Sequence, residues 1–361
     1  MTVGLAFHRE AAVTISTMPA PSATVRREEF YERIAPQRMA PLWTRIKSLV
    51  PKEPTPIGVP HRWGYADVRP FLMESATLIS AEEAERRVLI LENPALVGQS
   101  QIASTIYAGL QLIMPGEVAP AHRHTQSALR FVLEGSGAYT AVDGEKTLME
   151  PGDFVITPSW TWHHHGNDSA GPMIWVDGLD IPMVAAFNST FREDHREAKA
   201  DVTRPDGDAL ARYGMGLLPI DYRARSLNSP IFNYPYRRTR EALATLARTG
   251  DPDSHHGYLM RYVNPLDGGW AMPTLATMIR LLPKGFATRS YRSSDSMIFV
   301  GVEGRATVSV AGQSLPLSPR DVVVVPGWIG YTLAADEESV VFGFSDRVAQ
   351  EKLGIFREAR Q

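Results

Sequence analysis

Short apolar and alternating segments, separated by turn residues, dominate the chain from residue 102 onwards and predict β-strands. The pair Asp143-Gly144 separates the strand-like runs 139–142 and 146–148 and is a strong signal for a two-residue hairpin. Pro151-Gly152-Asp153 marks another turn, ahead of a buried-looking strand at 154–157. Strands spaced by about 8–12 residues predict an all-β barrel architecture.

Helical patterns are few and lie outside these strand-rich segments. Residues 28–50 predict two short helices. Ser80 and Glu83 match the two ends of a capping box, so a short helix should continue to about Arg87. A further helix is predicted at 237–248, where apolar residues recur at helical spacing within a polar, proline-punctuated stretch.

The barrel pattern occurs twice in the chain. Residues 129–135 have a counterpart at 296–304, and residues 151–160 have a closer one at 319–328. The two blocks are offset by 169 and 168 residues, so turns and strands recur in one order at nearly one spacing. This repetition indicates an internal duplication.

The patterns divide the chain into five expected parts, as follows: an N-terminal arm with helices at 1–98, a first barrel at 99–183, an inter-domain connector at 184–264, a second barrel at 265–345 and a C-terminal helix at 346–361. Residues 1–27 have the composition of a mobile arm, with a weaker likeness to a transit peptide as the alternative.

Charge and composition narrow the possible partners. Lys and Arg total 37 and Asp and Glu total 40, a formal net charge of −3, which predicts no affinity for nucleic acid or membrane surfaces. The chain has no cysteine, so any metal must bind through nitrogen and oxygen atoms. The absence of cysteine also fits a cytoplasmic protein.

Three histidines carry the candidate chemistry. His122 and His124 are separated by one residue and therefore share a strand face, and a hairpin return can bring His163 opposite them. Three imidazoles on one face form an open metal site, with positions left for other ligands.

The second barrel lacks this set, because the corresponding residues are Tyr291, Ser293 and Tyr331. We therefore expect metal in the first barrel alone and a structural or assembly role for the second. His255 and His256 have no partner at ligand spacing and are expected to be surface or loop residues.

The chain resembles the bicupin ring-cleaving dioxygenases of the gentisate 1,2-dioxygenase type. The resemblance rests on Tyr107-Ala-Gly-Leu-Gln111, on Ala119 to Phe131 and on Trp160 to Asn167, and it extends from about residue 63 to 356. It implies two double-stranded β-helix (jelly-roll) barrels, with N-terminal helices and a mixed connector. It also implies one Fe(II) per chain, ring cleavage by O₂ between the carboxyl- and hydroxyl-bearing carbons, and a homotetramer. One departure is His164, where many relatives have Asp; by strand parity His164 should point out of the barrel.

Metal cupins usually add a glutamate ligand, and here that slot is Ala128 or Leu129, with Ala128 favoured. Three neutral imidazoles leave the full +2 charge on the metal, whereas a glutamate would lower it to +1. A 2-hydroxybenzoate that binds through carboxylate and phenolate is a dianion and neutralises that charge. The missing glutamate therefore favours such a substrate.

Two further residues are candidate catalytic groups by strand parity with the ligands. His165 shares the parity of His163, and in the related enzymes the matching histidine contacts substrate or dioxygen. Arg130 shares the parity of His122 and His124, because positions 122, 124, 126, 128 and 130 share one strand face, and an inward arginine needs an anion. The substrate carboxylate is one such anion; a buried salt bridge to Asp177 or Glu134 is the alternative.

The remaining substrate-site candidates rest more heavily on the resemblance. Tyr107, Gly109 and Gln111 alternate along a strand that lines the pocket in related enzymes, with Gly109 leaving room for the ring; ordinary barrel packing is the alternative. Arg86, ahead of a strand-like run at 88–92, would reach the substrate carboxylate or else be a surface charge. Asp177 would orient a ligand imidazole or pair with an arginine.

Gentisate is the favoured substrate, cleaved to maleylpyruvate, because its second hydroxyl pushes electrons into the ring. Salicylate, 5-nitrosalicylate and 1-hydroxy-2-naphthoate are the alternatives within the class. A zinc or manganese cupin isomerase and a non-enzymatic ligand-binding cupin are the alternatives from other classes.

Overall fold

The N-terminal part of the chain forms a separate helical unit. The computed structural model describes residues 22–361, and the chain divides into two compact units, 1–53 and 54–361. The first unit contains helices α1 (Ala23–Ile34) and α2 (Ile46–Leu49), with 3₁₀ turns at Ala35–Gln37 and Leu42–Thr44. Two helices are therefore confirmed here. Of the arm predicted for residues 1–27, residues 1–21 lie outside the described part of the chain, and α1 begins at residue 23.

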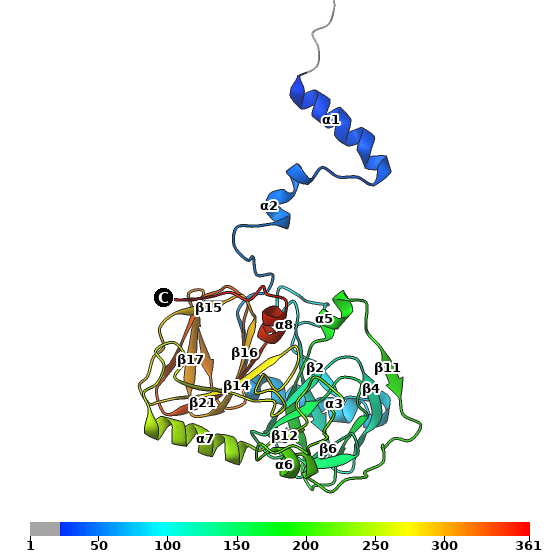
Figure 1. The fold of residues 1–361 in the computed structure, drawn as a ribbon, viewed down its shortest axis with the longest axis vertical. Helices are drawn as coiled ribbons and strands as arrows, with labels where there is room; N and C mark the ends of the chain where they lie inside the picture. Colours follow the sequence, from blue (N-terminus) through cyan, green and yellow to red (C-terminus); the bar gives the residue numbers. More distant parts are fainter. Residues whose placement is uncertain (1–21) are drawn as a thin grey trace, which may run out of the picture. The chain divides into compact units, whose positions relative to one another are not determined.

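The second unit consists of two β-barrels, each made of two facing antiparallel sheets (Figure 1). The first barrel comprises β2 (Val88–Ile90), β3 (Tyr107–Ile113), β4 (Val118–His124), β5 (Ala128–Glu134), β6 (Ala138–Val142), β7 (Glu145–Leu148), β8 (Phe154–Thr157), β9 (His163–Asn167), β10 (Met173–Leu179), β11 (Arg192–Asp194) and β12 (Asn233–Tyr234). The second comprises β1 (His61–Trp63), β13 (Tyr258–Arg261), β14 (Ala276–Leu282), β15 (Tyr291–Ser293), β16 (Met297–Glu303), β17 (Ala306–Val310), β18 (Gln313–Leu317), β19 (Val322–Val325), β20 (Tyr331–Ala335), β21 (Ser339–Ser345) and β22 (Glu358–Arg360).

The two barrels have the same strand order, which confirms the predicted bicupin duplication. The six-stranded sheets run β12-β8-β5-β10-β3-β2 and β1-β19-β16-β21-β14-β13. The five-stranded sheets run β11-β4-β9-β6-β7 and β22-β15-β20-β17-β18. Strand for strand, each position in one list corresponds to the same position in the other, including the edge strands.

The predicted hairpin joins β6 and β7, with Val142 opposite Glu145. Asp143 and Gly144 both have positive φ, 46° and 80°, as this two-residue turn requires. The six-stranded sheets of the two barrels share one hydrophobic core, in which Phe131 stacks on Phe342 with ring centroids 4.1 Å apart.

Two strand–helix units connect the barrels in a reciprocal way. Strand β1 pairs with the second barrel, and the helix that follows, α3 (Tyr65–Leu78), bonds back to the first. The Tyr65 N–H donates to Asp321 of the second barrel at 2.8 Å, while the Tyr65 hydroxyl and Arg69 both donate to Glu134 of the first at 2.8 Å. We call β1 with α3 the first staple.

The second staple is β12 with helix α7 (Tyr236–Thr249), and it repeats these contacts with the barrels exchanged. The Tyr236 N–H donates to Asp153 of the first barrel at 2.8 Å. The Tyr236 hydroxyl and Arg240 donate to Glu303 of the second at 2.5 and 2.9 Å. The staples therefore tie each barrel to the other through buried or half-buried polar groups.

Several elements differ from the prediction. The N-cap bond of the predicted capping box is present, with Ser80 accepting from the Glu83 N–H at 3.0 Å, but α4 (Ala81–Ala84) ends where Glu85 adopts a positive φ of 52°. Beyond β10 the connector contributes α5 (Ile181–Ala186), α6 (Asp208–Tyr213) and edge strands to both barrels.

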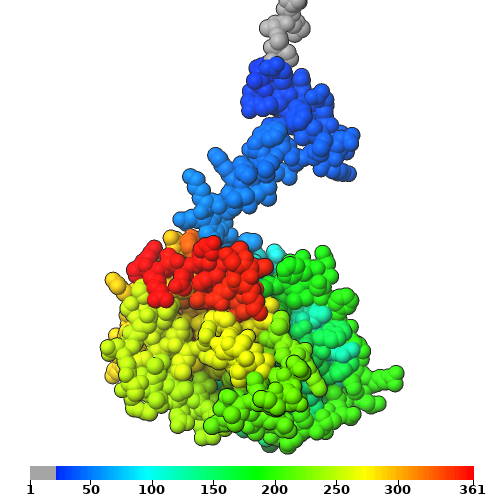
Figure 2. All heavy atoms as spheres, viewed as in Figure 1, coloured from blue at the N-terminus to red at the C-terminus, as the bar shows by residue number. Residues whose placement is uncertain are grey.

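The C-terminal segment is a short helix, α8 (Arg347–Lys352), followed by strand β22 instead of further helix. It lies at the surface of the second barrel (red in Figure 2) because β22 pairs with β15. No helix among residues 22–361 is long and apolar enough to cross a membrane.

Candidate metal centre

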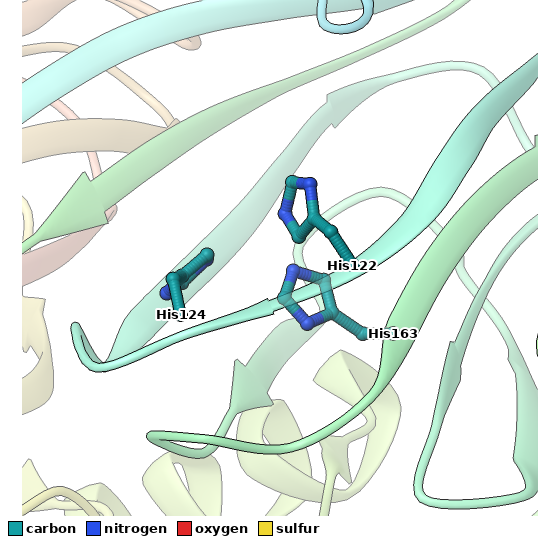
Figure 3. Close-up of side chains that lie close together, drawn as sticks. All are labelled: His122, His124 and His163. Atoms are coloured by element: carbon teal, nitrogen blue, oxygen red, sulfur yellow. The ribbon is translucent and has the colours of Figure 1, made fainter. Parts of the chain in front are cut away.

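The three histidines predicted as ligands converge within the first barrel. Antiparallel pairing of β4 with β9 places His122 directly opposite His163, and His124 follows two residues later on the same face. The ring centroids are 4.6 to 5.3 Å apart, and one ring nitrogen of each lies within 4.8 Å of the others (Figure 3). The predicted juxtaposition is therefore present.

Backbone carbonyls orient two of the rings. The Nδ1 atom of His124 lies 2.9 Å from the Gln126 carbonyl oxygen, and that of His163 lies 2.8 Å from the Thr161 carbonyl oxygen. A carbonyl oxygen only accepts, so each Nδ1 carries the proton and each Nε2 presents its lone pair. The Nε2 of His163 is buried and has no protein partner, which fits a metal ligand.

Burial keeps all three imidazoles neutral. Desolvation lowers the pKa of His122 to about 2 and that of His124 to about 4, and it lowers the pKa of His163 well below its ordinary value. Nearby positive charge, from Arg86 and Arg130 among others, adds to the effect. Neutral imidazole is the form that binds a metal, so the site is prepared for one at neutral pH.

Arg86 lies in this site and is not a surface charge. Its Nη2 donates to the Pro120 carbonyl oxygen at 2.8 Å and lies 3.3 and 3.4 Å from the two ring nitrogens of His122. Desolvation, with repulsion from Arg130, lowers the Arg86 pKa to about 9. The early end of α4 at Glu85 is what lets the chain turn Arg86 inwards.

Arg130 forms the buried ion pair that was the alternative to a substrate contact. It lies opposite Asp177 in the β5–β10 register, with Nε 3.4 Å from Oδ1, and its Nη1 donates to Thr157. Asp177 also accepts from the Trp175 indole at 3.0 Å, and desolvation raises its pKa to about 6 against the influence of Arg130. Glu134, the other predicted partner, pairs with Arg69 instead.

The parity argument that placed Arg130 inwards assumed one continuous strand, and this was wrong. Strand β4 ends at His124 and β5 begins at Ala128, with a turn between them in which the Ser127 N–H donates to Asp180 at 3.0 Å. Arg130 nevertheless lies close enough to His163 and His165 for its charge to lower the pKa of both. Ala128 is fully buried and shares a face of β5 with Arg130.

His165 lies on the metal-facing side of β9, as its parity predicts. Its ring centroid is 5.8 Å from that of His163, its Nδ1 lies 3.0 Å from Thr140 Oγ1, and its buried Nε2 has no protein partner. His164 points the opposite way, towards Tyr139 and the connector, where the Ala200 N–H donates to it at 3.3 Å.

Strand β3 brings the other candidates to the edge of the site. Gln111 is buried opposite Trp175, and burial raises the Tyr107 pKa, with Asp177 adding to it. A Cβ on Gly109 would lie 2.5 Å from Val88 Cγ1 and 3.2 Å from the Tyr107 hydroxyl. Glycine here makes room for Val88 of β2, which agrees with the packing alternative for this position.

The sequence analysis missed the polar residues that hold the charged groups in place. Thr140 and Thr157 contact His165 and Arg130, and Trp175 contacts Asp177. The available signal was a polar residue in an otherwise apolar strand: Thr157 ends the buried run of β8, and Thr140 lies among apolar residues of β6.

Comparison with known proteins agrees with this geometry. The cupin-domain family model matches residues 109–181. Gentisate 1,2 dioxygenase 1 of Aquipseudomonas alcaligenes is 52% identical over 94% of this chain and 98% of its own length. The 5-aminosalicylate 1,2-dioxygenase of a Comamonas species is 34% identical over 92% of this chain and 89% of its own.

Among solved structures, salicylate 1,2-dioxygenase of Pseudoaminobacter salicylatoxidans, as adducts with gentisate, matches with a TM-score of 0.88 at 33% identity. The match covers 97% of both chains. Identity at this level over the full length, with the metal-site geometry in place, shows that the chain belongs to the family of gentisate 1,2-dioxygenase-type bicupin ring-cleaving dioxygenases.

Proposed function

We propose that this chain is an Fe(II)-dependent gentisate 1,2-dioxygenase, which cleaves the ring between the carboxyl- and hydroxyl-bearing carbons and yields maleylpyruvate. The observation that carries the proposal is the convergence of His122, His124 and His163, with the Nε2 lone pairs of His124 and His163 available, in a chain 52% identical to a gentisate dioxygenase. Identity to the salicylate dioxygenase is lower, at 33%, which favours gentisate over salicylate.

The three histidines fit one Fe(II) per chain. Bound there, iron supplies the transfer of electron density from an aromatic dianion to O₂. The protein's own part is to hold three neutral imidazoles on one side, so that the opposite side is left for substrate and O₂. The carbonyl contacts of His124 and His163 fix the ring orientation, which a mobile imidazole would not provide.

Besides the metal, two arginines supply positive charge at the site. Arg86 and Arg130 both influence the ligand histidines electrostatically, and among the residues that the structure describes Asp177 is the one carboxylate paired with either, at 3.4 Å from Arg130. In our proposal the substrate carboxylate lies against these guanidinium groups. A buried arginine has five donors, and Asp177 and Thr157 leave some of those on Arg130 available.

His165 would act on the substrate or on oxygen from the face of β9. It is fully buried and its pKa is held well below the ordinary value by desolvation, so it is a neutral hydrogen-bonding group at pH 7. Tyr107, Gly109 and Gln111 of β3 would form the wall that contacts the ring.

Assembly as a homotetramer is part of the proposal. The supporting observation is the segment 22–53, in which α1 and α2 contain no buried residue and Leu42, Trp43 and Leu49 are exposed. Apolar side chains of this kind are usually covered by another subunit. Light scattering after size-exclusion chromatography would measure the mass.

The decisive experiment is oxygen uptake by protein loaded anaerobically with Fe(II). We expect one O₂ consumed per gentisate, with slower turnover of salicylate and none with Zn(II). Consumption of the aromatic acid without O₂ uptake in Zn(II)-loaded protein would support the isomerase class instead. Absence of turnover on every 2-hydroxybenzoate, with iron bound, would leave the dioxygenase proposal without support.

A further inference from the structure

The second barrel contains a buried arginine at the position that Gln111 occupies in the first. Arg280 lies in the middle of β14, is 1% exposed, and has its guanidinium carbon 5.1 Å from the centroid of the Phe299 ring. Its Nε and Nη1 have no hydrogen-bond partner in the described protein. It therefore occupies the interior of the second barrel at the level where the first barrel has its metal centre.

No carboxylate neutralises this arginine among the residues that the structure describes. The two other buried arginines each face one: Arg87 lies 2.7 Å from Glu117, and Arg130 lies 3.4 Å from Asp177. Arginine stays protonated in proteins, and an unpaired charge taken out of water is strongly unfavourable. Arg280 thus differs from its counterparts in lacking a counter-charge.

The groups around Arg280 are phenols and an imidazole. Tyr331, which replaces His163, and Tyr291, which replaces His122, both act electrostatically on Arg280, and their ring centroids are 5.9 Å apart. Burial raises the pKa of Tyr331 to about 12, so this phenol is not an anion at neutral pH. Tyr291 is 4.6 Å, centroid to centroid, from His256, whose buried Nδ1 has no partner. His256 lies in the turn 254–256, as the loop prediction has it, with its ring half-buried against Tyr291.

Two acidic residues act on these tyrosines without pairing with Arg280. Glu358 accepts from the Tyr291 hydroxyl at 2.8 Å. Asp295 is buried near Tyr291 and Tyr331, and its Oδ1 has no hydrogen-bond partner in the described protein. Neither carboxylate forms an ion pair with Arg280 among the described residues, so the guanidinium has no counter-charge there.

We propose that the second barrel binds a small monovalent anion, a halide or a formate-sized carboxylate, against Arg280, Tyr331 and His256. The size follows from the residues that surround it: two tyrosines replace two smaller histidines, and Phe299 closes another side. An aromatic acid such as the substrate is therefore too large. The duplicated barrel has exchanged a cation-binding centre for an anion-binding one at the same level of the fold.

The first test is the thermal midpoint of the iron-loaded enzyme in increasing bromide or formate, at constant ionic strength set with sulfate. An anion that binds only the folded state raises the midpoint until the site saturates. Wild-type protein should show this saturable rise, and Arg280→Gln, which installs the first-barrel residue, should lose it. Arg305→Gln is the matched control, because Arg305 is an exposed arginine of the same barrel.

Comparison of bromide with formate identifies which anion the site prefers. Anions also compete at the metal centre, so inhibition of turnover is measured in parallel. That inhibition should be the same in Arg280→Gln as in wild type, which separates the two sites. An unchanged saturable rise in Arg280→Gln would overturn the proposal.

Crystals of the wild-type holoenzyme grown in bromide give an independent result, which decides the matter if Arg280→Gln does not fold. We expect an anomalous peak in contact with the Arg280 guanidinium at bromide concentrations that saturate the thermal shift. No peak there, or a peak only at concentrations far above saturation, would refute the assignment.

Discussion

Arg130 interacts with Asp177 and, in our proposal, with the substrate carboxylate, and a double-mutant cycle separates these roles. The variants are Arg130→Met, Asp177→Asn and the double variant. At the observed 3.4 Å and an effective dielectric of about 20, the Arg130–Asp177 attraction amounts to about 5 kcal/mol before desolvation is counted. Removing one partner of a buried pair typically costs about 3–5 kcal/mol.

Stability should therefore fall in both single variants and recover in part in the double variant. The loss of stability caused by Arg130→Met should also grow as pH rises. The folded-state pKa of Asp177 is already raised to about 6, above the ordinary value of 3.8, so this group reduces stability as pH rises between those values. Without Arg130 the folded-state pKa is higher still, and the loss continues above pH 6. Thermal melts of the iron-loaded proteins between pH 5 and 8 measure this.

The three variants should rank differently in kcat/KM than in stability. If Arg130 holds the substrate carboxylate, both variants that lack it should lose about 2–5 kcal/mol of transition-state binding, which is about 30-fold to several thousand-fold in kcat/KM. Asp177→Asn should lose much less and should retain iron. Recovery of near wild-type kcat/KM in the double variant would refute the reasoning, because Arg130 would then act only as the partner of Asp177.

Three further outcomes are expected. His122→Ala should lose iron, and wild-type protein should hold about one iron per chain by metal analysis; a value near two would contradict a metal-free second barrel. Ala128→Glu should retain or tighten iron but lose most turnover, since unit charges about 4 Å apart interact by roughly 4 kcal/mol at a dielectric of about 20; wild-type kcat and KM would argue against the dianion model. The hydrogen bond from Arg69 lowers the folded-state pKa of Glu134 below its ordinary 4.5, so this pair stabilises the fold above about pH 4.5 and the stabilisation is lost as pH falls through the folded value. Arg69→Met should therefore lower stability at neutral pH and make it fall less on acidification, and an acid-unfolding profile that matches wild type would exclude a contribution from the pair.

The metal site was largely predictable because its determinants are local. A spacing of two residues fixes the common face of His122 and His124, and the hairpin between them and His163 is marked by Asp143-Gly144. The duplication was visible for the same reason, since turns and buried strands recur in order. These features depend on period and turn chemistry, which a single sequence displays.

What could not be predicted depends on pairing between distant segments. Strands β1, β11 and β12 have two or three residues each, too few to show a period, and their partners are far away in the sequence. The choice of Asp177 over Glu134 as the partner of Arg130 is set by the β5–β10 register, which has a bulge after Ile174. One signal was available and missed: Tyr65-x-x-x-Arg69 recurs as Tyr236-x-x-x-Arg240, 171 residues later.

Because the staples are reciprocal, each of the two barrels of this enzyme depends on the other for its polar contacts. Each barrel anchors the strand of one staple and receives the tyrosine and arginine of the other, so neither has a complete set of polar contacts on its own. A chain truncated after the first barrel and its connector would keep Arg69 and Tyr236 but lose Asp321 and β19, which hold the first staple, and Glu303, which holds the second. The interior residues of the second barrel can therefore change, but the barrel itself cannot be removed. Engineered substitutions are best placed inside the second barrel, away from the four carboxylates that accept hydrogen bonds from the staples, Glu134, Asp153, Glu303 and Asp321.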